Sequence, residues 1–375
     1  MLKVKEVKTN KEKKDFLNFP LKMYKDNKNF VPPLYIDEKK IFSKNYIYYD
    51  TCEAIYFNCY DNNKMVGRIS AILQKSSNEK WNQNRVRFTR FDAINDINVA
   101  KVLFKEVEKW AKSKQMSEVV GPLGFSDLER EGLLIEGFDE LATFEEQYNA
   151  SYYKDLIEAC GYTKEVDWIE HKLFVPKDDK QLSRLEKLSD LMMNRYHLKY
   201  ANCKSISEII KRYGKQIFQT IDKTYENIYG TVPFSDGMRK MLIDSFKLIV
   251  RPKDVALIVD ENDRLVCFGL LIPSIAKAVQ KSSGHLTIPA IIKILKAKKN
   301  PKILDLGLIG VLPEYEMRGI ASSAVAKIIK TLKEDNIEYA ETNLNLETNH
   351  HIINQWKNFD AIQHKRRRCF IKKID

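Results

Sequence analysis

A glycine-containing turn between two apolar segments is the part of this 375-residue chain best suited to chemistry. The run Leu304–Val311 predicts a strand, and Ser322–Lys333 predicts a helix that begins directly after the turn. Such a turn directs several backbone N–H groups at one point, at the positive end of the helix dipole, which suits a diphosphate. Gly319 lets a ligand approach the backbone closely, and Ala321 is too small to block it.

This turn resembles the acyl-CoA-binding signature of the GNAT superfamily of N-acetyltransferases. In that signature Arg or Gln is followed by two residues, a Gly, one residue, and Gly or Ala. Gly319 and Ala321 fit it, Glu316 stands where Arg or Gln is usual, and Arg318 offers positive charge instead. The resemblance implies that backbone amides hold the diphosphate of acetyl-CoA or CoA, those of Met317, Arg318, Gly319, Ala321 and Ser322.

The whole chain resembles bacterial tandem-GNAT proteins, in which two such domains follow one another. The resemblance is carried by segments spread over the sequence: Val120–Phe125, Glu131–Asp139, Gly161–Trp168, Phe268–Pro273, Gly310–Tyr315 and Glu341–Asn349. It implies a fold and a cofactor class and leaves the acceptor open. A loop-rich part, residues 121–139, either forms an acceptor pocket between the domains or covers a sheet end.

Two units of similar order are predicted, with a polar boundary near residue 176. We expect an α/β (α+β) fold with a GNAT-like domain over residues 1–176 and a second over residues 177–375. Each should have a mixed, mostly antiparallel sheet flanked by helices. A hairpin is expected over residues 53–73, a helix over residues 98–114, a helical insertion over residues 182–246 and a last strand over residues 369–374. The first unit lacks the glycine turn, because Asp92 to Asn98 after its central strand contains no Gly and two carboxylates. We therefore expect it to be degenerate in cofactor binding.

If the resemblance holds, the strand ending at Val311 diverges from a strand over residues 338–346. The pantetheine arm then pairs with backbone groups of Ile309 and Val311, whose side chains belong to the core. Asn349 matches a position that bonds the cofactor arm in many GNAT proteins, and it is equally suited to cap a helix over residues 350–358.

Acyl transfer to an amine needs a base for the amine and an acid for the leaving thiolate. Glu347 and Glu341 lie nearest the expected gap and are the predicted catalytic residues, although Glu341 also fits a plain surface position. Many GNAT proteins place a Tyr acid on the last helix, but Trp356 stands at that position here. This departure leaves two functions open: an N-acetyltransferase or other N-acyltransferase, and a non-catalytic acyl-CoA-binding or regulatory protein.

Composition and charge limit the classes of partner that we expect for this protein. The formal charge is +12, and the only dense basic run, Lys365–Arg368, reads as a solvated strand face or turn. A transferase that uses aminoacyl-tRNA or an acyl carrier is the third alternative, although a nucleic-acid partner is not favoured. Six scattered cysteines show no zinc spacing, so no metal is expected. No apolar run is long enough to span a membrane and no secretory signal is visible. We expect a cytoplasmic protein with a small-molecule or peptide amine acceptor and no membrane partner, and a homodimer is left open.

Overall fold

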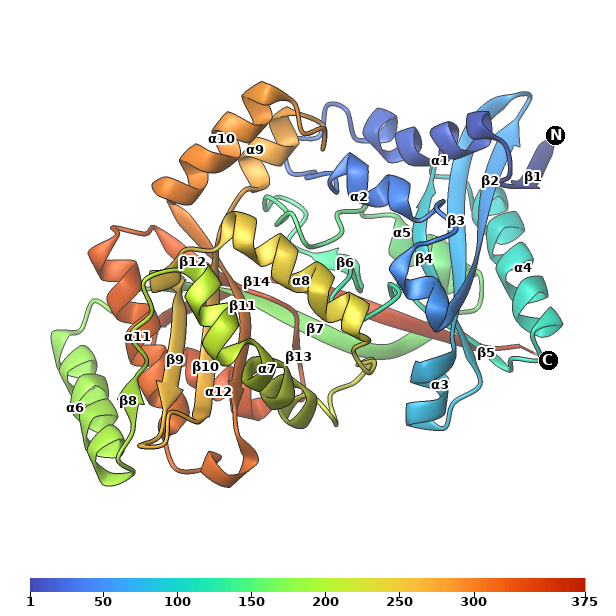
Figure 1. Ribbon diagram of the computed structural model, residues 1–375. Helices are drawn as coiled ribbons and strands as arrows, with labels where there is room; N and C mark the ends of the chain where they lie inside the picture. Colours follow the sequence, from blue (N-terminus) through green and yellow to red (C-terminus); the bar gives the residue numbers. More distant parts are fainter. Residues whose placement is uncertain (375) are drawn as a thin grey trace.

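A single mixed sheet runs through the whole molecule, with helices on both of its faces (Figure 1). The computed structural model describes residues 1–374, so Asp375, the last residue of the predicted second domain, lies outside the described part. The predicted α/β class is confirmed. Two strand pairs are parallel, and every other pairing within residues 1–374 is antiparallel.

The first half of the chain alternates strands with short and long helices. Its elements are β1 (Leu2–Glu6), α1 (Asn10–Met23), α2 (Tyr35–Lys40), a 3-10 turn η1 (Ile47–Asp50), β2 (Cys52–Asp61), β3 (Lys64–Gln74), α3 (Lys75–Trp81), β4 (Arg85–Ala93), α4 (Ile97–Ser113), β5 (Glu118–Gly121), β6 (Leu133–Glu136), α5 (Tyr153–Ala159) and β7 (Thr163–Phe174). The predicted hairpin is formed by β2 and β3, and Asn62 and Asn63 make its turn with φ of 45° and 70°.

The second half begins with helices and ends with a long strand. Its elements are α6 (Asp179–Arg195), β8 (Lys199–Tyr200), α7 (Ile206–Thr224), α8 (Asp236–Ile249), η2 (Pro252–Asp254), β9 (Val255–Val259), β10 (Leu265–Pro273), α9 (Ala276–Lys281), α10 (Ile288–Lys299), β11 (Ile303–Val311), η3 (Pro313–Tyr315), α11 (Ile320–Glu334), β12 (Tyr339–Thr342), β13 (Asn345–Leu346), α12 (His350–Trp356) and β14 (Asp360–Lys373). No helix of the described chain is long and apolar enough to cross a membrane.

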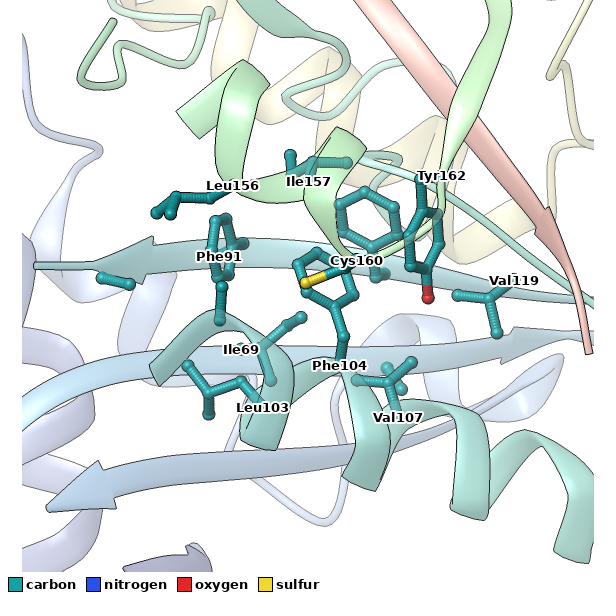
Figure 2. Close-up of a cluster of buried hydrophobic side chains, with 14 of the residues drawn as sticks. Ile69, Phe91, Leu103, Phe104, Val107, Val119, Leu156, Ile157, Cys160 and Tyr162 are labelled. Atoms are coloured by element: carbon teal, nitrogen blue, oxygen red, sulfur yellow. The ribbon is translucent and has the colours of Figure 1, made fainter. Parts of the chain in front are cut away.

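The core of the first half lies between α4, α5 and the sheet (Figure 2). The apolar face of α4 contributes Leu103, Phe104 and Val107, all buried, and these pack on Phe91 of β4. Aromatic contacts tie the layers together, because the Phe104 ring lies 4.9 Å from that of Phe91 and 4.8 Å from that of Tyr162.

The two halves exchange their last strands. The sheet order is β1-β2-β3-β4-β5-β14-β7-β12-β11-β10-β9-β8, so the C-terminal strand β14 lies between β5 and β7 of the first half. In turn, β7 pairs with β12 of the second half. Figure 1 shows β14 in red as it crosses from the second half to the first. The boundary near residue 176 therefore divides the chain and not the sheet.

Three predicted elements differ from the structure. The predicted helical region 182–246 consists of three helices, α6, α7 and α8. It is interrupted after α6 because the short strand β8 pairs with β9. The strand over residues 338–346 breaks into β12 and β13, because the pairing with β11 ends at Thr342 and only the pairing with β7 resumes at Asn345. The last strand, predicted over residues 369–374, begins at Asp360, because its charged residues find acidic partners in neighbouring strands.

Candidate functional site

The strands β11 and β12 diverge as the sequence predicts. They pair in parallel from Ile303 to Leu306, and β12 ends at Thr342. Beyond that point β11 continues to Val311 with its far edge free of a partner strand. Open strand backbone offers one N–H and one C=O per residue to a ligand, which is what an amide-bearing arm requires.

Two side chains form hydrogen bonds with the backbone at this open edge. The Tyr225 hydroxyl donates to the Ile309 carbonyl at 2.9 Å and accepts from the Ile309 N–H at 3.3 Å. Asn343 donates its amide to the Gly307 carbonyl at 3.2 Å. The backbone groups of Ile309 therefore face the gap, as expected, but a ligand must displace Tyr225 to reach them. No local sequence pattern indicates this contact, because Tyr225 lies more than eighty residues away from Ile309 in the chain.

The turn after β11 contains two left-handed residues, Met317 (φ 61°) and Gly319 (φ 75°), and Gly319 is the N-cap of α11. No side chain caps this helix. The amide of Ser322 bonds the Gly319 carbonyl at 3.1 Å, and that of Arg318 reaches the Tyr315 carbonyl at 3.4 Å. The amides best placed for an anion are therefore those of Met317, Gly319 and Ala321, among the five that the resemblance implies.

Gly319 is needed here for its conformation. A Cβ atom at this position would lie 3.4 Å from Cγ of Met192 on α6, and the positive φ disfavours any other residue. The guanidinium of Arg318 lies over the rings of Tyr196 and Tyr315, at 5.3 Å from each. Its charge stays beside the turn, although the residue does not line the cleft described below.

Of the two roles that the sequence left open for Asn349, the structure shows the helix cap. Its side chain caps α12 by accepting from the Ile352 N–H at 3.4 Å, and the residue also lines the cleft. Trp356 is buried, and its indole N–H donates to Asn345 at 2.8 Å. Because this hydrogen bond fixes the indole against β13, Trp356 is a structural residue at the end of α12.

A cleft of about 630 Å³ joins the open edge to the first half of the chain. On one side it is lined by β11, by the turn with Gly319 and by α12; on another it is lined by Leu242 and Phe246 of α8. The first half closes it with Trp168 and with the loop that follows β5. The volume lies within the usual range for small-molecule sites. The loop over residues 121–139 therefore lies at a pocket between the two halves, which is the location required by the first of its two predicted roles.

Carboxylates gather at the wall that the first half contributes. Asp127 accepts from the Val232 N–H at 3.1 Å, Glu129 accepts from Tyr46 at 2.9 Å, and Glu146 pairs with Arg367 at 2.9 Å. The remaining two, Glu131 and Glu145, also line the cleft. The sequence analysis named neither as a site residue, although Glu131 opens one of the segments that carry the resemblance.

Glu131 and Glu145 have no ion-pair partner within the described chain. Glu131 is 5% exposed, and its Oε1 atom has no hydrogen-bond partner among residues 1–374. Burial, reinforced by the nearby charge of Asp127, raises its pKa well above the usual value for Glu. Burial raises the pKa of Glu145 to about 7, against an opposing influence of Arg130. Glu145 can therefore exchange a proton near neutral pH, whereas the raised pKa of Glu131 favours its neutral form.

The two predicted bases lie elsewhere. Glu341 is buried and pairs with Lys365 and, at 3.3 Å, with His364. Its burial favours the neutral acid, but Lys365 outweighs this and the net pKa is lowered. Glu347 pairs with Lys164 and, at 2.8 Å, with Arg366, and the hydrogen bond from Lys164 lowers its pKa. Neither residue lines the cleft, so the structure does not bring them to the open edge.

The equivalent gap in the first half is filled by its own chain. β4 and β5 pair in parallel only from Arg85 to Arg87. Beyond that point the Leu123 N–H donates to the Phe88 carbonyl at 2.9 Å, in the place of an open edge. The following helix α4 is capped by the Asp96 carboxylate, which accepts from the Asn98 N–H at 2.8 Å. A phosphate would meet a negative charge there, so only the second half offers a free anion site of this kind within residues 1–374.

No group of three or more His, Cys, Asp and Glu side chains in the described part of the chain is arranged to hold a metal ion. A diphosphate fits the uncapped turn, and an amide-bearing arm fits the open edge of β11.

Comparison with solved structures identifies the fold as that of tandem GNAT proteins. The chain superposes over 100% of its length on 99% of a tandem GNAT protein from the clavulanic acid biosynthesis pathway, with a TM-score of 0.58 and 10% identity. It also matches the glucosamine N-acetyltransferase region of a fungal multidomain β-N-acetylglucosaminidase, with a TM-score of 0.58 and 12% identity over 99% of this chain and 38% of that one.

Two curated proteins are similar in sequence. Protein YghO of Escherichia coli (strain K12) is 27% identical over 372 residues, which cover 96% of this chain and 93% of YghO. The bacterial ceramide synthase of Caulobacter vibrioides is 24% identical over 336 residues, which cover 86% of this chain and 79% of that protein. No protein-family model matches the chain.

Proposed function

We propose that the protein is an acyl-CoA-dependent N-acyltransferase that binds its donor in the second half and its amine acceptor against the first. The observation that carries this proposal is the single cleft that joins an uncapped helix start and an open strand edge to two unpaired carboxylates. The two ends of this cleft suit the two substrates of acyl transfer.

The donor end is formed by the turn and by β11. The diphosphate of CoA lies against the amides of Met317, Gly319 and Ala321, where the helix dipole adds favourable potential. The pantetheine arm then pairs with Ile309 and Val311 once the Tyr225 hydroxyl has moved away. The thioester carbonyl would then lie in the cleft that β11 shares with the carboxylates of the first half.

The acceptor is an amine that carries an apolar chain. Leu242, Phe246 and Ile272 give the cleft an apolar wall beside the carboxylates. One similar protein is a ceramide synthase, and ceramide is the N-acylated form of a long-chain amino alcohol. An acceptor of that class would place its ammonium near Glu131 and Glu145 and its chain on the apolar wall. Acetyl-CoA is the smallest donor that this arrangement accepts, and the apolar wall leaves room for longer acyl groups.

Glu145 is the proposed general base, in place of Glu341 and Glu347. With a pKa of about 7 it is ionised in a large fraction of molecules at neutral pH and can still accept a proton. It takes a proton from the ammonium, and the amine lone pair then attacks the thioester carbonyl carbon. As the C–N bond forms and the C–S bond breaks, the second amine proton passes to the thiolate, which leaves as CoA with a free thiol.

Release of free CoA from acyl-CoA donors and a panel of amines tests the proposal. With a long-chain amine, the wild-type rate should rise with pH through about 7, because the ionised carboxylate is the active form. Glu145→Gln should lower the rate by about a hundredfold or more and remove this dependence while CoA still binds. Glu186→Gln, at an exposed position of α6, is the matched control. An unchanged rate in Glu145→Gln would refute the assignment of the base.

A non-catalytic acyl-CoA-binding protein is the second candidate. It is favoured by the structural role of Trp356, since no tyrosine on α12 can serve as acid. Saturable CoA binding with no CoA release across the whole amine panel would support this candidate over the enzyme.

A further inference from the structure

The helix α10 exposes a row of large aliphatic side chains on one of its faces. Ile288, Ile291, Ile292 and Leu295 are between 43% and 76% exposed. Their spacing of three and four residues places them on a single face of the helix. Leu286, just before the helix, is exposed as well. Scattered exposed aliphatic residues need no explanation, but a contiguous row of this kind marks an interaction surface.

This row is not the face that attaches α10 to the protein. The opposite side of the helix carries Ala290, which is buried, and Ile294, which packs into the apolar cluster formed with α8 and α9. Lys298 also donates to the carbonyls of Lys247 and Leu248 at the end of α8. The helix is thus fixed by one apolar side while a second apolar side faces outward.

The charged residues along this stretch of the chain have one sign. No acidic residue occurs between Arg264 and Leu304, and this stretch contains seven lysines: Lys277, Lys281, Lys293, Lys296, Lys298, Lys299 and Lys302. The helix itself carries Lys293, Lys296, Lys298 and Lys299. A helix with aliphatic residues on one face and lysines beside them matches the composition of an anionic lipid surface, which offers an apolar layer beneath negative phosphates.

We propose that the exposed face of α10, formed by Ile288, Ile291, Ile292 and Leu295, docks the protein on an anionic membrane surface. A nucleic acid would use the lysines and leave the isoleucines in water, so it fits the surface less well. A second copy of this chain would bring the same lysines against one another. Of these three partners, only an anionic lipid surface offers an apolar layer for the aliphatic row and negative charge for the lysines.

This docking is compatible with the absence of a spanning helix and departs from the expectation of no membrane partner. That expectation was based on the length of apolar runs, which bears on spanning segments and not on a helix that lies in the interface. The location is informative, because Ile294 of α10 shares its apolar cluster with Phe246 and Ile272, which line the cleft. A docked α10 therefore lies directly behind one wall of the cleft.

Cosedimentation of the full-length protein with vesicles tests the proposal. The wild type should bind vesicles of phosphatidylglycerol and phosphatidylcholine, should bind pure phosphatidylcholine much more weakly, and should be released by salt. Because one aliphatic side chain contributes about tenfold to partitioning, Ile292→Gln with Leu295→Gln should weaken binding by about a hundredfold. Lys293→Gln with Lys296→Gln should reduce the salt dependence.

Leu191→Gln is the matched control, since Leu191 is 59% exposed on α6, away from this surface. It should bind vesicles like the wild type, and all variants should show the wild-type circular dichroism. The proposal is overturned if the wild type does not bind anionic vesicles or if the α10 variants bind unchanged. It is also overturned if light scattering shows a dimer that the α10 variants dissociate, or if single-stranded RNA binds the protein and vesicles do not.

Discussion

The Tyr225 hydroxyl forms hydrogen bonds with the backbone groups of β11 that a ligand would use. It satisfies both the N–H and the C=O of Ile309, and burial raises its own pKa to about 12, so it stays protonated at physiological pH. Because an unpaired backbone group away from water is costly, this contact stabilises the open edge of β11. The same contact opposes binding, since a ligand must replace it.

Tyr225→Phe should therefore bind CoA more tightly than the wild type. A hydrogen bond contributes about 0.5–1.5 kcal/mol net, so freeing Ile309 should lower the dissociation constant by about threefold to tenfold in a calorimetric titration. Tyr229→Phe is the control, because Tyr229 lines the same cleft but has its hydroxyl near the Cys369 sulfur. Weaker binding in Tyr225→Phe would mean that the hydroxyl contacts the ligand instead of competing with it.

At the scale of elements, β14 shows how a charged strand can be buried. Lys365 and Arg367 are fully buried, and Arg367 donates to Glu170 at 2.7 Å and pairs with Glu146 at 2.9 Å. On the other face Arg368 pairs with Asp167 at 2.8 Å. Each basic residue faces a carboxylate from an element far away in sequence, so the run Lys365–Arg368 is not the solvated face that its composition indicates.

Arg367→Met should destabilise the protein by about 3–5 kcal/mol, because it removes the counter-charge of Glu146 and leaves Glu170 with Lys365 alone, at 3.7 Å. Urea denaturation followed by tryptophan fluorescence measures this change. Arg184→Met, at an exposed position of α6, should change the free energy of unfolding by less than about 0.5 kcal/mol. Equal stability of the two variants would show that the internal ion pairs contribute little.

The sequence predicts the elements that have a local signal and misses those that depend on distant partners. The hairpin of β2 and β3, the helix α4 and the turn with Gly319 follow from turn residues, periodicity and a glycine. The length of β14 and the break between β12 and β13 depend on pairing with β7, which no local pattern encodes. In the same way the open edge was predictable, whereas Tyr225, Glu131 and Glu145 reach the cleft only through the tertiary fold.

At the scale of the whole molecule, the exchange of β7 and β14 makes the two halves dependent on each other. β14 pairs with β5 and β7, and β7 pairs with β12, so removing either half leaves strands of the other without partners. The cleft also needs both halves, since the donor side comes from the second and the carboxylates from the first. The first half, with its own gap filled, serves as a wall and a source of carboxylates.

We therefore expect one cooperative unfolding transition in urea. Tryptophan fluorescence reports on Trp81, Trp110, Trp168 and Trp356, which are spread over both halves, and circular dichroism reports on the backbone. The two signals should coincide, because each half completes the sheet of the other. Two separated transitions would show that the halves are stable independently and that the exchanged strands add little.

The most direct test of the central claim is a calorimetric titration of CoA into the wild type and into Gly319→Glu, with Asp96→Glu as the matched acidic control in the first half. A carboxylate at residue 319 would strain the turn and repel the diphosphate. We predict one CoA per chain for the wild type and for Asp96→Glu, and no measurable binding for Gly319→Glu at unchanged circular dichroism. Absence of CoA binding by the wild type, or equal binding by Gly319→Glu, would contradict the account.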